Sequence, residues 1–134
     1  MKKYLLSHTL IVLLLLSITG CRSEEDKSMI IELRNNTSAE IPKVQVVAVG
    51  SAGTRLLAEK ENLAAGVIYR QSARYKSFPD SDGSYELRLT EVSGNRTFRF
   101  GYFTNGTALD KYFFLQIEKD TVLVSSIARE LKAY

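Results

Sequence analysis

The sequence predicts an all-β domain, built as a two-sheet β-sandwich of about seven or eight strands. From residue 29 onward, short segments alternate apolar and polar residues, the period of a half-buried strand. Gly, Asn, Asp and Pro interrupt these segments at intervals of about ten residues. The segments themselves are rich in β-branched and aromatic residues, which favour strands.

The first half of this region predicts two clear strands and one ambiguous segment. Residues 29–34 form the first strand, which Asn35-Asn36 end. Residues 43–49, KVQVVAV, form the second, and Gly50 to Gly53 have the length of a hairpin turn. Residues 54–65 contain strong helix formers, so a helix and a short strand followed by a loop both remain open. We favour the strand, because the neighbouring segments are strands.

The middle of the chain predicts a strand, a turn and a hairpin. Residues 66–77 form a plausible strand, and 78–83 form a turn in which Pro, Asp and Gly suit tight backbone geometry. Residues 84–92 alternate regularly, and 93–95 have the length of a three-residue hairpin loop. One face of this strand carries Tyr85, Leu87 and Leu89.

The last third predicts three more strands. Residues 96–104 place Phe98, Phe100 and Tyr102 on one face, and Gly101 indicates a bulge or close packing. Asn105-Gly106 is a turn signal, and residues 111–118 place Phe113, Leu115 and Ile117 on one face. Residues 119–120 connect to a last strand over 121–127, and 128–134 fit a closing helical turn. This pattern resembles immunoglobulin-like or transthyretin-like envelope modules, although the Cys–Trp–Cys spacing of true immunoglobulin domains is missing.

The N-terminus has the form of a secretory signal. Lys2 and Lys3 precede an apolar run within residues 4–18 that is too short to span a membrane. The following Ile18-Thr19-Gly20-Cys21 resembles the lipobox of bacterial lipoproteins. That resemblance implies diacylglycerol on the Cys21 sulfur and cleavage just before it. The alternative is an ordinary signal or membrane anchor with a chance cysteine.

The lipobox defines the expected domain organisation and location. Residues 1–20 are the signal peptide, 21–28 an acidic tether, and 29–134 one β-sandwich domain. A lipid on Cys21 anchors the mature protein in a membrane, because two or more acyl chains bind stably. We expect the outer membrane, because Cys21 is followed by Arg22 and not by the Asp that marks inner-membrane retention in many enteric lipoproteins. The acidic run Glu24-Glu25-Asp26 resembles a surface-export signal of one group of Gram-negative anaerobes. It is also what a solvated tether requires, so the cell surface and the periplasmic face both stay open.

Composition excludes several function classes for the mature chain. Without Lys2 and Lys3 it is nearly neutral and lacks a basic tract, so it offers no electrostatic site for nucleic acid. Its single histidine, His8, lies in the signal, and its single cysteine is the expected lipid carrier. Ser-His and Cys-His nucleophiles and His- or thiolate-ligated metals are therefore excluded. We expect a protein that is not an enzyme and needs no cofactor.

Three groups of residues could still form a site. The carboxylates of Asp80, Asp82 and Glu86 are weak metal candidates, for which a solvated hairpin turn is the simpler interpretation. Cationic and aromatic side chains predict a possible partner-binding surface, with a charged solvent-facing edge and core packing as the alternatives. Its candidates are Arg70, Arg74, Tyr75, Lys76, Phe103, Tyr112 and Phe114.

These observations favour a lipid-anchored, non-catalytic binding or accessory module for a protein or glycan partner. The alternative is a periplasmic structural or inhibitor protein that acts on an envelope enzyme through loop 78–84 or 104–110.

Overall fold

The computed structural model describes residues 28–74 and 78–128, which form strands and no helix. The first strands are β1 (Met29–Asn35), β2 (Ile41–Gly50), β3 (Gly53–Leu63) and β4 (Ile68–Ala73). They are followed by β5 (Gly83–Glu91), β6 (Gly94–Thr104), the two-residue β7 (Thr107–Ala108), β8 (Asp110–Ile117) and β9 (Val122–Ala128).

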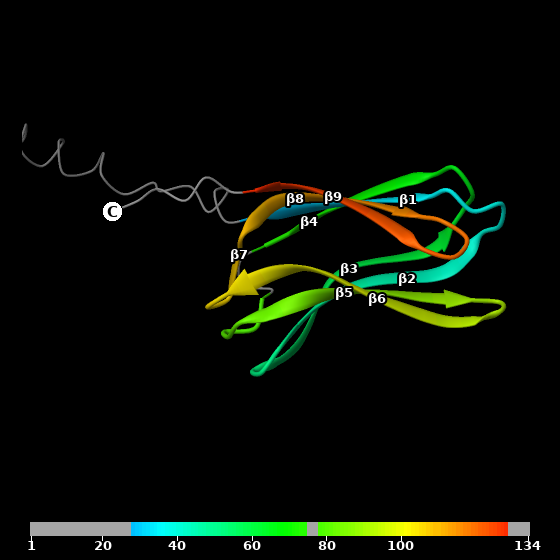
Figure 1. The fold of residues 1–134 in the computed structure, drawn as a ribbon. Coiled ribbons are helices and arrows are strands. Elements are labelled where there is room, and N and C mark those ends of the chain that lie inside the picture. Colours follow the sequence, from blue (N-terminus) through cyan, green and yellow to red (C-terminus); the bar gives the residue numbers. More distant parts are fainter. Residues whose placement is uncertain (1–27, 75–77, 129–134) are drawn as a thin grey trace, which may run out of the picture.

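The strands form two sheets that pack face to face, which confirms the all-β sandwich (Figure 1). One sheet has the order β4-β1-β8-β9, and the other has the order β3-β2-β5-β6-β7. Strands β1 and β8 run parallel, whereas every other pair is antiparallel. The immunoglobulin order places the first two strands in one sheet, but β1 and β2 lie in different sheets here.

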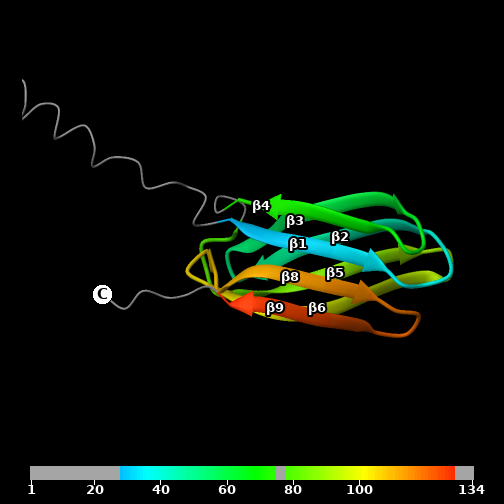
Figure 2. The ribbon, with the colours of Figure 1, turned by 90° about the horizontal axis from the view of Figure 1, so that it is seen from above.

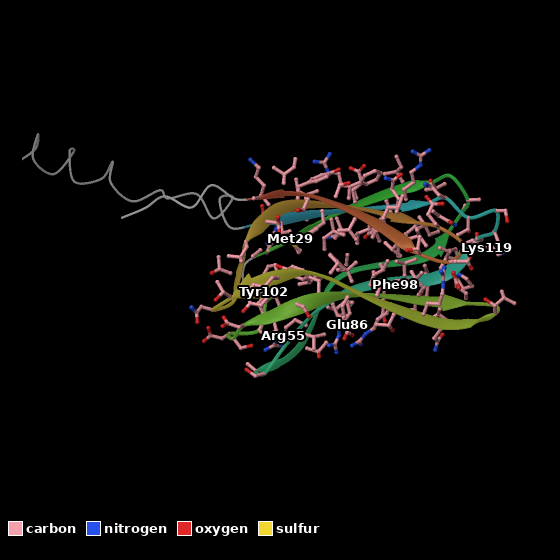
Figure 3. All side chains as sticks on the ribbon, viewed as in Figure 1. Met29, Arg55, Glu86, Phe98, Tyr102 and Lys119 are labelled. Carbon is pink, nitrogen blue, oxygen red and sulfur yellow. The ribbon has the colours of Figure 1, made fainter. Side chains whose placement is uncertain are left out.

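The core lies between the sheets and follows the alternation of the sequence. Each of the central strands sends every second side chain inward, as Figure 3 shows for the space between the two layers. The strands β1, β5 and β8 contribute Met29, Ile31, Leu33, Tyr85, Leu87, Leu89, Phe113, Leu115 and Ile117. The predicted inward faces of 84–92 and 111–118 are therefore confirmed.

The ambiguous segment 54–65 is a strand followed by a short loop. It forms β3, which pairs with β2 but shifts register between Val46 and Val47. Ala58 lies opposite Val46 and Leu56 opposite Val47, so Leu57 is the extra residue. Because of this bulge, Leu57 and Ala58 are both buried although they are adjacent.

A second bulge lies in β6 at Gly101. Phe100 pairs with Tyr85 and Phe103 pairs with Gly83, which leaves one extra residue in β6. Gly101 takes a φ of 54°. The expected bulge is confirmed, but the face of Tyr102 was predicted wrongly. The bulge turns Tyr102 outward, with 48% of its surface exposed, and turns Phe103 fully inward.

The turns agree with the sequence except in one length. Gly50 pairs with Gly53 across a two-residue hairpin turn, as expected. Asn105 and Gly106 both have positive φ, the backbone that a tight Asn-Gly hairpin requires. The predicted three-residue loop 93–95 is wrong, because Glu91 pairs directly with Gly94 and leaves only Val92-Ser93 between the strands.

Several predictions fall outside the described residues. They are the signal peptide, the lipobox with Cys21, most of the acidic tether, residues 75–77, and the closing turn beyond Ala128. Within residues 28–74 and 78–128, the structure contains no helix long and apolar enough to cross a membrane.

Candidate binding surface

Three of the predicted partner-binding residues meet on the outer face of the four-stranded sheet. Arg70 of β4 pairs with Glu32 of β1, and Glu32 pairs in turn with Phe114 of β8. Ile30 of β1 pairs with Tyr112 of β8 one step along the same face. Because residues paired across a sheet point to the same side, these side chains form one continuous row. We call the outer surface of this sheet the aromatic face.

The centre of the aromatic face holds one short polar chain. The hydroxyl of Tyr112 donates a hydrogen bond to Oε2 of Glu32 at 2.8 Å. The guanidinium carbon of Arg70 lies 5.9 Å from the centre of the Tyr112 ring, a cation–π distance. Partial burial, and then the hydrogen bond to the Glu32 carboxylate, raise the pKa of Tyr112. The phenol therefore remains a neutral donor, and the cation, ring and carboxylate hold one another in place.

Aliphatic side chains surround this polar chain. Ile127 of β9 pairs with Tyr112, and Leu123 of β9 pairs with Gln116, which places both on the aromatic face. Ile68 of β4 pairs with Arg34 on the same side. All three aliphatic side chains are about half exposed. The sequence analysis missed Leu123 and Ile127, because only the pairing with β8 shows which side of the sheet they occupy.

The remaining partner-binding candidates do not join this surface. Arg74 is exposed but lies just beyond the end of β4. Tyr75 and Lys76 lie outside the described residues. Phe103 is fully buried and packs its ring 5.5 Å from that of Tyr85, so it belongs to the core rather than to a contact surface. The bulge at Gly101 is the reason, since it reverses the direction of every later side chain in β6.

Of the three carboxylates Asp80, Asp82 and Glu86, considered as a weak metal site, Asp82 and Glu86 bind other protein groups. Oδ1 of Asp82 accepts hydrogen bonds from the Thr104 hydroxyl and the Asn105 backbone N–H, which lower the pKa of Asp82. Glu86 points to the outer side of the five-stranded sheet (Figure 3). Across residues 28–74 and 78–128, no three His, Cys, Asp or Glu side chains gather in a way that could hold a metal ion.

The outer face of the five-stranded sheet carries charged side chains that pair with one another, together with the half-exposed Leu56 and Tyr102. Oε2 of Glu86 accepts from Arg88 at 2.8 Å, and its Oε1 accepts from Arg99 at 3.2 Å. Hydrogen bonds from Arg88 first, and then from Arg99, hold the pKa of Glu86 below its ordinary value against the opposing effect of burial. Nearby, Lys43 lies 3.1 Å from Glu59. Cations of the same face therefore neutralise the carboxylates of Glu59 and Glu86.

Hydrogen bonds join loops 78–84 and 104–110, the two loops through which an inhibitor could act. Besides the contacts of Asp82, the backbone N–H of Gly106 donates to the Ser81 carbonyl at 3.2 Å. A Cβ on Gly106 would lie 3.2 Å from the Pro79 carbonyl oxygen, so the backbones approach closely. Loops 78–84 and 104–110 thus form one double-loop end of the sandwich.

Comparisons with known proteins identify no family for this chain. No protein-family model matches it, and no curated protein matches its sequence. Among solved structures it is similar to pneumolysin, with a TM-score of 0.37 and 12% identity over 75% of this chain. The matched region is 23% of the length of pneumolysin, so the chain spans about a quarter of that protein.

Proposed function

We propose that this protein is a lipid-anchored, non-catalytic binding module of the bacterial envelope, and that its aromatic face contacts a protein partner. The observation that carries the proposal is the convergence of Arg70, Tyr112 and Phe114 on one face, among half-exposed aliphatic side chains. Tyr and Arg are the residues most enriched where interfaces gain their binding energy. The ion pairs of the opposite face, Lys43 with Glu59 and Glu86 with Arg88 and Arg99, also support the choice of this side.

A protein fits this face better than a glycan does. Its aromatic rings are accompanied by the half-exposed aliphatic groups Ile68, Leu123 and Ile127. The central carboxylate, Glu32, already accepts a bond from Tyr112. Burying apolar surface under a protein releases about 25 cal/mol per Å². A sugar ring would leave much of this aliphatic surface in water.

The anchor and the location rest on the lipobox resemblance at Ile18 to Cys21. Metabolic labelling with a palmitate analogue tests the anchor, with Cys21→Ala as the control that should lose the label. Protease treatment of intact cells tests the location. Digestion of the domain in intact cells places it at the surface, and digestion only after lysis places it in the periplasm.

Two matched arginine variants test the aromatic face. Arg70→Ala removes the cation over Tyr112, whereas Arg55→Ala removes an exposed cation from the edge strand of the other sheet. Chemical crosslinking in whole cells should give a saturable adduct with one envelope protein. We expect Arg70→Ala to weaken it by about tenfold, in line with a loss of more than about 1 kcal/mol at an interface hot spot. Arg55→Ala should retain it.

Three outcomes would count against the proposal. Equal adducts from both variants would show that the aromatic face is not used. Saturable binding to a purified glycan that Arg70→Ala abolishes would replace the protein partner with a carbohydrate. Turnover by the purified chain in a hydrolase screen would remove the non-catalytic assignment.

The double-loop end supports the alternative, a periplasmic inhibitor or structural protein. Hydrogen bonds of Asp82 and Gly106 link its two loops, and a rigid element of this kind suits an inhibitor that enters a partner's site. Asp82→Ala separates the two functions, because it loosens this end and leaves the aromatic face intact. Loss of partner binding in Asp82→Ala, with retention in Arg70→Ala, would favour the inhibitor.

A further inference from the structure

The edge strand β9 differs in chemistry from the other edges of the sandwich. Its sequence, VLVSSIA, contains no charged residue, proline or glycine. Its side chains Leu123, Val124 and Ile127 are 51%, 44% and 52% exposed. Among the described strands, β9 pairs only with β8, so its other side is an open edge (Figure 2).

The other edges carry the features that prevent a strand from pairing with another chain. Charged residues and bulges on an edge strand oppose such pairing. Strand β3 has a bulge at Leu57 and carries Arg55, Glu59, Lys60 and Glu61. Strand β4 carries Arg70, and strand β6 carries Arg96 and Arg99 and is covered at one end by β7. Strand β9 carries no charge along Val122–Ala128, and the register shift in its ladder, between Asp110 and Tyr112, adds its extra residue to β8 and not to the edge strand.

The turn before β9 determines which backbone groups of this strand bond to β8 and which point to the open edge. The backbone N–H of Glu118 donates to the Thr121 carbonyl, so these two residues form a hydrogen-bonded pair. Such pairs alternate along an antiparallel ladder. The register from Ile117–Val122 to Tyr112–Ile127 has no shift, so Leu123, Ser125 and Ile127 bond to β8. The N–H and C=O groups of Val122, Val124 and Ser126 therefore point away from β8, toward the open edge.

We propose that this edge is an interface with a second copy of the chain, in which β9 pairs antiparallel with β9 about a two-fold axis at Ser125. In this register Val122 faces Ala128 of the second copy, so all seven residues of the strand find a partner. Val124 faces Ser126 of the second copy, and the backbone N–H and C=O groups of both residues point toward the open edge. A shift in either direction leaves part of the strand unpaired.

The side chains also fit this register. Leu123 and Ile127, each about half exposed on the aromatic face, become direct cross-strand neighbours of Ile127 and Leu123 of the second copy. Cross-strand side-chain pairs are the unit that stabilises a sheet, so these two apolar contacts favour the pairing. No charge opposes a like charge, because the strand has none. The pairing joins two four-stranded sheets into one of eight strands and goes beyond the proposed contact with another protein.

Disulfide trapping at the two-fold axis tests the interface in the full-length chain. The two Ser125 residues would form a non-hydrogen-bonded pair, with Cα atoms about 4.5 Å apart, within the range that a disulfide accepts. Ser125→Cys is expressed in cells, oxidised with copper phenanthroline and examined on a non-reducing gel. Val92→Cys, at the exposed tip of the β5–β6 hairpin, reports random collisions. The unsubstituted chain reports any background from Cys21.

We expect at least a tenfold stronger homodimer band from Ser125→Cys than from Val92→Cys. Equal bands would overturn the proposal, as would an adduct of Ser125→Cys with a different protein in place of the homodimer. Ser126→Pro added to Ser125→Cys should remove the band. It deletes an edge-facing N–H but no bond to β8, so the fold tolerates it. A band that survives Ser126→Pro would refute pairing through this edge.

A charge exchange tests the register and does not depend on proline. Leu123→Lys with Ile127→Lys places like charges opposite each other in both cross-strand pairs and should abolish the Ser125→Cys dimer. Leu123→Lys with Ile127→Glu places opposite charges there and should restore it. Both positions are half exposed, so both variants should fold. Loss of the dimer in the Lys/Glu variant, or its persistence in the Lys/Lys variant, would contradict the register.

Discussion

Replacement of Gly101 by alanine should destabilise the sandwich more than any other Gly→Ala change at a site of positive φ. Gly101 lies at the bulge of β6 with a φ of 54°. A Cβ there would lie 2.5 Å from Cζ of Phe113 and 2.8 Å from Cδ2 of Tyr85. Both rings are buried and pack against each other, with centres 5.4 Å apart, so neither can move away easily.

Two separable costs contribute to this effect. A left-handed backbone costs a non-glycine residue about 1–2 kcal/mol. Overpacking a well-filled core costs about 1–3 kcal/mol more. The sum, about 2–5 kcal/mol, is a large part of the roughly 5–15 kcal/mol that stabilises a typical domain. At about 4–8 °C per kcal/mol, the Tm should fall by roughly 10 °C or more.

Gly66→Ala is the matched control, because Gly66 has a φ of 75° and a Cβ there would meet nothing within 4 Å. It carries the backbone cost without the packing cost. Thermal and urea unfolding of the purified protein, followed by circular dichroism, measure both variants. If Gly101→Ala lowers the free energy of unfolding by no more than Gly66→Ala does, the argument from Phe113 and Tyr85 is wrong.

The remaining predictions concern hydrogen bonds and ion pairs within the sandwich. Arg96→Ala should lower the free energy of unfolding, measured in urea, by about 1–3 kcal/mol. Arg96 bonds to Glu91 and to the Lys119 carbonyl, so its loss leaves the largely buried carboxylate of Glu91 unpaired. Arg55→Ala, at an exposed site, should leave the free energy of unfolding unchanged, and an equal loss in both variants would contradict this assignment. Glu86→Gln should cost about 1 kcal/mol at neutral pH, because it weakens the hydrogen bonds to Arg88 and Arg99. Because the pKa of Glu86 is lowered in the folded state, its stabilising effect is complete above the ordinary value of 4.5 and is lost as the pH falls through the folded value. Urea titrations across this range should therefore show a smaller loss of stability on acidification for Glu86→Gln than for the unsubstituted protein, and parallel losses would refute the role of Glu86.

The sequence was most informative where strands alternate without interruption. Strands β5 and β8 have strict period-two patterns, and their inward faces were predicted correctly. Asn105-Gly106 also specified its turn, since both residues take positive φ. These features are local, because a pleated strand and a tight turn depend on neighbouring residues alone.

Apart from the length of the hairpin turn at 93–95, the predictions that were wrong or left open concern features set by distant residues. The sequence indicated a bulge at Gly101 but did not show that it would bury Phe103 and expose Tyr102. Strand β3 stayed ambiguous because residues 54–65 contain strong helix formers, and its pairing with β2, which decides for the strand, is not visible in the sequence. The aromatic face combines β1, β4, β8 and β9, and the sequence alone does not specify that β1 lies between β4 and β8.

The two outer faces show which residues the fold requires and which it does not. Both sheets turn every second side chain outward, and on the five-stranded sheet these positions hold ion pairs such as Lys43 with Glu59 beside isolated apolar side chains such as Leu56. A solvated sandwich needs no more than this. On the four-stranded sheet the same kind of position holds Leu123 and Ile127, which remain half exposed and contribute little to the core. Charged residues there would leave the fold intact, so folding alone does not explain the apolar ones, which is why we propose a contact with another molecule on this face.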